Sequence, residues 1–111
     1  MLGANDSKDG NWNVRNCKAG FEDDMQLLFE LFTNLSTTVF ASYAPAVDTM
    51  NPCCTINDTV VQLQQPMINN AAAATGSLVL NTHAFTQSHT DSSGCGGATS
   101  NPCWYTDGVR K

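Results

Sequence analysis

An apolar residue recurs every three or four positions between Phe21 and Val39. The spacings are 4, 3, 4, 3 and 4, and the set comprises Phe21, Met25, Leu28, Phe32, Leu35 and Val39. Such spacing is typical of the seam of a helix that packs against other helices. Three acidic residues follow Phe21, where carboxylates stabilise the positive end of a helix dipole. The pattern predicts a long helix over about residues 21–43, ended by Pro45.

The apolar face of this helix is wider than a two-stranded contact needs. Phe29 and Leu31 fall beside the seam and extend it on both sides. A lone helix exposing so much apolar surface would aggregate, so another surface must cover it. Two interpretations remain open and are compatible: ordinary core packing within one domain, or a seam between subunits.

A second helical stretch is predicted over about residues 57–87. Thr55 and Asn57 are both plausible N-caps, and Pro66 should kink or split the helix, since a proline removes a main-chain hydrogen bond. Residues 77–85 suit a strand as well as a helix, but no partner strand is evident, so we favour a helix. The expected fold is mainly α: an antiparallel helical hairpin, or a small three-helix bundle if Pro66 breaks the second helix.

Polar segments flank the helical part, which we place at residues 21–90 of a single domain. Residues 1–20 form a predicted irregular N-terminal arm, and residues 91–111 form a Cys- and Gly-rich loop and tail. Aromatic side chains isolated in polar segments dock onto the parent domain or onto a neighbouring subunit. The candidate intersubunit anchors are Trp12, Trp104 and Tyr105.

The chain has five cysteines, an odd number. A bridge between Cys95 and Cys103 is favoured, because it would close a glycine-rich loop that loses much entropy on ordering. The pairing of Cys17, Cys53 and Cys54 stays open, either with one another or with the C-terminal region. No CxxC pair is present, and adjacent cysteines do not easily present two thiolates to one zinc ion, so no metal site is expected.

The composition excludes several classes of partner. Five Lys and Arg oppose ten acidic residues, giving a net charge of −5, so the cation cluster that binds nucleic acid or anionic membranes is missing. No run of about 20 apolar residues predicts insertion into a membrane. The neutral, polar, lysine-poor composition is typical of extracellular, cell-surface and virion proteins. The first residues contain no signal-peptide pattern.

No catalytic or cofactor-binding motif is present, so neither an enzyme nor a cofactor is expected. We expect a structural or interaction protein, a small helical subunit packing with copies of itself or with other protein subunits in an extracellular or virion assembly. The alternative is a monomeric, disulfide-tied secreted carrier of a small hydrophobic ligand, or an inhibitor. For a carrier, Phe29, Phe32 and Phe40 would surround the ligand cavity.

Overall fold

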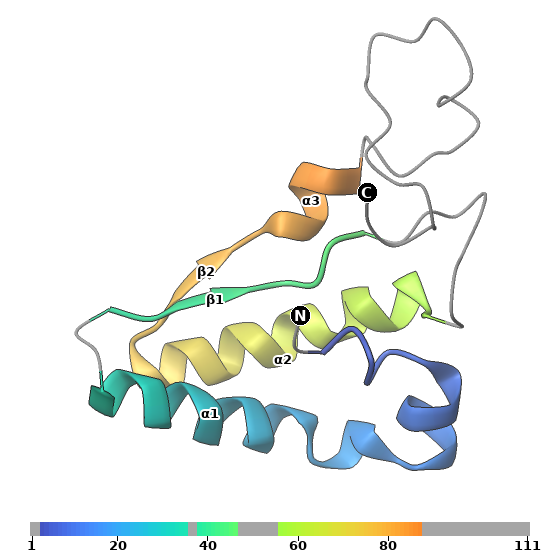
Figure 1. Ribbon diagram of the computed structural model, residues 1–111, viewed down its shortest axis with the longest axis horizontal. Coiled ribbons are helices and arrows are strands. Elements are labelled where there is room, and N and C mark those ends of the chain that lie inside the picture. Colours follow the sequence, from blue (N-terminus) through green and yellow to red (C-terminus); the bar gives the residue numbers. More distant parts are fainter. Residues whose placement is uncertain (1–2, 36–37, 47–55, 88–111) are drawn as a thin grey trace, which may run out of the picture.

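Helices and short strands alternate along the chain. The computed structural model describes residues 3–35, 38–46 and 56–87. The main elements are α1 (Phe21–Leu35), β1 (Phe40–Ser42), α2 (Asp58–Thr75), β2 (Leu78–Leu80) and α3 (Thr82–Gln87) (Figure 1). The mainly helical character predicted from the sequence is confirmed.

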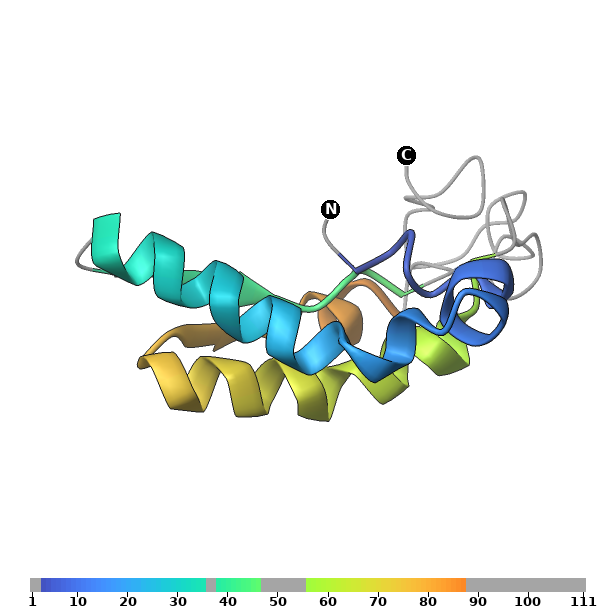
Figure 2. The ribbon, with the colours of Figure 1, turned by 90° about the horizontal axis from the view of Figure 1, so that it is seen from below.

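The two long helices run in the same direction, so the predicted antiparallel hairpin is wrong. Figures 1 and 2 show α1 and α2 side by side, and β1 carries the chain back along them before α2 begins. β1 and β2 then pair in parallel, with Phe40 beside Leu78 and Ser42 beside Leu80. Because parallel strands need a long crossover connection, α2 serves as that connection.

Helix α1 is shorter than the sequence predicts. It ends at Leu35, whereas the apolar spacing predicts a helix to about residue 43. The chain beyond Leu35 is rich in hydroxyl and β-branched residues, including Thr38 and Val39, which disfavour a helix and favour a strand. The strand that follows, β1, is the partner that sequence analysis did not find for residues 78–80. The helix expected over 77–87 is therefore strand β2 followed by α3.

Helix α2 is well capped and is not split at Pro66. The Asn57 side chain accepts hydrogen bonds from the main-chain N–H groups of Thr59 (2.9 Å) and Val60 (3.4 Å). Gly76 ends the helix at a φ of 71°, a conformation that glycine adopts without strain. Pro66 and Gln62, four residues earlier, are both exposed. Pro66 has no N–H to donate to the Gln62 carbonyl, and this carbonyl can be solvated by water instead.

The core lies between α1, α2 and β1. The small side chains of Ala71 and Ala72 let α1 approach α2 closely. The main cluster comprises Trp12, Phe21, Met25, Phe29, Ala41, Tyr43, Val60, Ile68, Ala71 and Ala72. The residues from α1 in this cluster are four positions apart, so one narrow stripe of the helix faces inward.

The N-terminal segment, residues 3–20, packs against this core. It contains a π-helical turn, η1 (Gly10–Val14), and a 3-10 helix, η2 (Cys17–Ala19). Trp12 is buried and meets Phe21 edge to face, with ring centroids 5.5 Å apart. The buried Gln64 amide donates to the Gly3 carbonyl at 3.0 Å, which ties the segment to α2. Trp12 therefore docks onto its own chain, one of the two roles the sequence allowed it.

The predicted seam of α1 is buried only at its beginning. Phe21 and Met25 belong to the core, but Leu28 is half-buried and Leu35 is 75% exposed. Val39 lies beyond the end of the helix. The buried stripe continues through Phe29, which the spacing placed beside the seam, because α2 and β1 cover α1 from one side only.

Replacing Phe29 or Phe32 by alanine tests which face of α1 is buried. Phe29 is 7% exposed and Phe32 is 47% exposed, so they form a matched pair on one helix. We expect Phe29→Ala to lower the free energy of unfolding by about 3–5 kcal/mol and Phe32→Ala by less than half of that. Urea denaturation at a single low protein concentration measures both. A larger loss for Phe32→Ala would restore the predicted seam as the buried face.

Candidate functional site

An apolar groove opens between the second half of α1 and strand β1. Its volume is about 320 Å³, and Ile68 of α2 contributes to its lining. The groove is lined by Met25, Leu28, Phe29, Phe32, Val39, Phe40, Ala41, Ser42, Tyr43, Pro45, Ile68 and Thr82. The set includes the three phenylalanines that the carrier interpretation places around a cavity. This size is at the lower end of the range for small-molecule sites.

The side-chain hydroxyl groups along the groove already have partners. The hydroxyl groups of Ser42 and Thr82 are 2.9 Å apart, and the Tyr43 hydroxyl donates to the Asn69 side-chain oxygen at 2.5 Å. The Thr82 hydroxyl also donates to the Tyr43 carbonyl. The side chains of the groove therefore offer a ligand mainly apolar contact, because the hydroxyl groups of Ser42 and Thr82 join the β1 segment to α3 and that of Tyr43 joins it to α2.

The two strands leave one face of their sheet uncovered by the described part of the chain. Ala41 of β1 packs into the core with Ile68, Ala71 and Ala72 of α2. Phe40 and Leu78, neighbours in register, are both more than half exposed on the opposite face, and Leu80 is 48% exposed. Parallel sheets in proteins are normally covered on both faces. This one therefore presents an unusual amount of apolar surface.

We use the name apolar surface for five exposed side chains of α1, β1 and β2: Phe32, Leu35, Phe40, Leu78 and Leu80. Their exposed fractions correspond to roughly 550 Å² on side chains of this size. Monomeric proteins seldom expose a larger apolar patch, and patches of this size are often functional.

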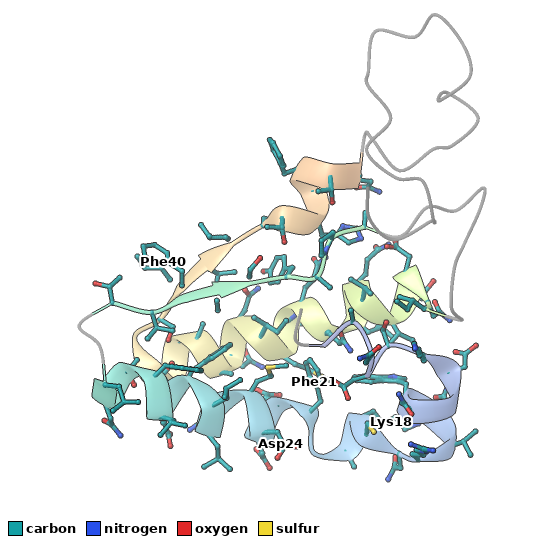
Figure 3. The ribbon with its side chains drawn as sticks, viewed as in Figure 1. Lys18, Phe21, Asp24 and Phe40 are labelled. Carbon is teal, nitrogen blue, oxygen red and sulfur yellow. The ribbon has the colours of Figure 1, made fainter. Side chains whose placement is uncertain are left out.

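Charge is concentrated away from this surface. Among the described residues, the charged side chains lie within residues 6–24, at Glu30 and at Asp58. Figure 3 shows Lys18 and Asp24 near the N-terminal turns and Phe40 on the far side of the molecule. The strands themselves are uncharged. Within residues 3–35, 38–46 and 56–87 there is thus a charged end and an uncharged, apolar end.

A buried histidine links α3 to the start of α2. The His83 Nε2 atom lies 3.0 Å from Asp58 Oδ1, and His83 is 4% exposed. The other carboxylate oxygen of Asp58 accepts a hydrogen bond from Gln62 at 2.8 Å. The Thr86 hydroxyl donates to the His83 carbonyl at 3.3 Å, and the His83–Asp58 pair joins α3 to the start of α2.

A second cavity, of about 470 Å³, lies between η2 and the first half of α1. Asp6, Asp24 and the free, half-buried thiol of Cys17 line it. Within the described residues, no three His, Cys, Asp or Glu side chains are grouped so as to hold a metal ion. None of the described helices is long and apolar enough to cross a membrane.

Several predicted site residues lie outside the described part of the chain. These are the candidate disulfide, Cys95 and Cys103, the cysteines Cys53 and Cys54, and the anchors Trp104 and Tyr105. The exposed surface made by Leu78 and Leu80 was not predicted from the sequence. The run of aliphatic residues over 78–80 is typical of a strand. Its partner strand, β1, was not recognised because residues 40–42 fell within the long helix predicted over about residues 21–43.

No known protein family matches the chain, and neither a curated protein nor a solved structure is similar to it.

Removing the Asp58 carboxylate should destabilise the fold. We expect Asp58→Ala to lower the free energy of unfolding by about 1–3 kcal/mol, because it leaves the buried His83 ring without this partner. Asp23→Ala, an exposed first-turn carboxylate of α1, is the control and should change stability little. Urea denaturation measures both variants. Equal small effects would show that the pair contributes nothing to holding α3.

Proposed function

We propose that this chain is a structural or interaction subunit that associates with other protein chains through its apolar surface. The observation that carries the proposal is that apolar side chains of both strands and of the end of α1 are exposed, while neither strand contains a charged residue. A standard interface buries about 800 Å² on each partner, of which a little over half is apolar. The apolar surface is large enough to supply that apolar part.

The chemistry of this surface favours a protein partner. Nucleic acid and anionic membrane surfaces attract clustered cations, whereas this chain has a net charge of −5. An uncharged apolar face is what the centre of a protein–protein interface needs. The neutral, lysine-poor composition supports an extracellular or virion setting for the assembly, as part of the same proposal.

Size-exclusion chromatography with light scattering tests the proposal on the full chain. We expect a mass that is a multiple of 11.9 kDa and that persists in reductant, because the contact does not require a disulfide. Raising the salt to about 1 M should not dissociate it, since an apolar contact is not screened as ion pairs are. A monomer at all concentrations would contradict self-association, and dissociation by salt would contradict an apolar contact.

The groove supports a second candidate function, the carrier of a small hydrophobic ligand. The observation that favours it is the placement of Phe29, Phe32 and Phe40 around one cavity of about 320 Å³. The ligand would be uncharged and apolar, because no charged side chain lines the groove.

Leu28→Trp and Leu27→Trp form a matched pair that tests this candidate. Leu28 lines the groove, whereas its neighbour Leu27 is exposed and does not. We expect the neutral dye N-phenyl-1-naphthylamine to bind one per chain, and Leu28→Trp to weaken it by roughly tenfold by filling the groove. Leu27→Trp should leave the affinity unchanged. Fluorescence titration measures the affinities, and either no saturable binding or equal loss in both variants would contradict a ligand site in the groove.

A further inference from the structure

Strand β2 has an open edge in the described part of the chain. β1 lies on one side of β2, and no described element lies along the other side (Figure 1). Leu78 donates its main-chain N–H to the Val39 carbonyl at 2.9 Å, and the Leu80 carbonyl accepts from Tyr43 at 3.2 Å. The main-chain N–H and C=O groups of Leu78 and Leu80 therefore point towards β1. Main-chain groups alternate along a strand, so the N–H and C=O of Val79, between them, point to the open edge.

Val79 offers the open edge one donor and one acceptor. Each residue that flanks β2 uses one of its main-chain groups elsewhere: the Ser77 N–H bonds to the Ala72 carbonyl at 2.9 Å, and the Asn81 carbonyl accepts from Phe85 at 3.3 Å. Val79 is left with an N–H and a C=O side by side. In an antiparallel pair, two such residues opposite one another exchange two hydrogen bonds.

We propose that β2 pairs with β2 of a second copy of this chain, antiparallel and across a two-fold axis. Val79 and Val79 of the partner subunit exchange two main-chain hydrogen bonds, and the two strand pairs become one four-stranded sheet. This inference rests on the proposed function and specifies its partner and contact. A two-fold interface must be self-complementary, and one donor beside one acceptor meets that requirement.

The side chains and charges favour a second copy. In this pairing Leu78 lies beside Leu80 of the partner subunit on the exposed face of the sheet, and such apolar cross-strand pairs stabilise antiparallel strands. Two copies with a net charge of −5 repel each other, so contact is least costly where charge is absent. β2 is uncharged and distant from the charged residues 6–24.

The open edge of β1 suits a second copy less well. That edge faces the groove, whose other wall is formed by Leu28 and Phe32 of α1. A whole second domain would have to enter between β1 and α1 to reach it. Nothing comparable stands beside Val79 among the described residues, which leaves β2 as the accessible edge.

Three variants of the full chain test the pairing by light scattering and analytical ultracentrifugation. Val79→Pro removes the outward N–H, and an edge strand tolerates the change because this N–H has no bond to the described part of the subunit. Leu78→Lys places like charges close to the two-fold axis. Leu63→Lys is the matched control, because Leu63 of α2 and Leu78 are both 54% exposed. We expect the first two to weaken association roughly 10- to 100-fold and the control to leave it unchanged.

The outcomes separate this inference from the proposed function. An assembly that persists in Val79→Pro and Leu78→Lys would overturn β2 pairing and leave self-association standing. Equal weakening by Leu63→Lys would also overturn the pairing, since the contact would not be confined to β2. A wild-type chain that is monomeric at every concentration would overturn both. Circular dichroism checks folding, and if Val79→Pro does not fold, Leu78→Lys against Leu63→Lys decides.

Discussion

The parallel pairing of β1 with β2 is the constraint on which the rest of the structure depends. Two parallel neighbours cannot be joined by a tight turn, so the chain between them must travel the length of the sheet and return. Helix α2 forms most of this crossover connection, which fixes the direction of α2 and brings it alongside α1. The core follows from this arrangement, because Ala41 of β1 and one stripe of each helix then meet in one layer.

A two-stranded parallel sheet is also an incomplete structure by itself. Small sheets become stable when further strands or a packed layer cover their apolar surface, and here α2 covers one face only. The uncovered side chains of Phe40, Leu78 and Leu80 and the open edge at Val79 have the same origin. The groove between α1 and β1 arises because β1 has a helix, and not a third strand, on its other side. Stability and function are thus linked, because the exposed side chains, the open strand edge and the groove that leave the fold incomplete are also the places where a partner can bind.

The charge distribution favours contact at the strands over contact at the N-terminal end. The N-terminal segment gathers most of the described charged residues around η1, η2 and the first turn of α1, where carboxylates also stabilise the helix. Trp12 and Gln64 secure this segment to the core, so the charged end is held away from the strands. Mutual repulsion between copies then disfavours contacts at that end.

The sequence by itself determined the mainly helical character, the start of α1 and the close approach permitted by Ala71, since helix-end charges and side-chain size act locally. It also determined a surplus of apolar residues on α1. For the N-cap of α2 it left Thr55 and Asn57 as alternatives, and the structure uses Asn57. Tertiary structure alone decided that residues 40–42 form a strand, that α1 and α2 run in parallel, and that Phe29 is buried while Phe32 is exposed. A three-residue strand has little intrinsic stability, so its identity depends on a partner that is distant in sequence. The apolar period of a helix shows only that a stripe exists, and which part of it is buried depends on what packs against it.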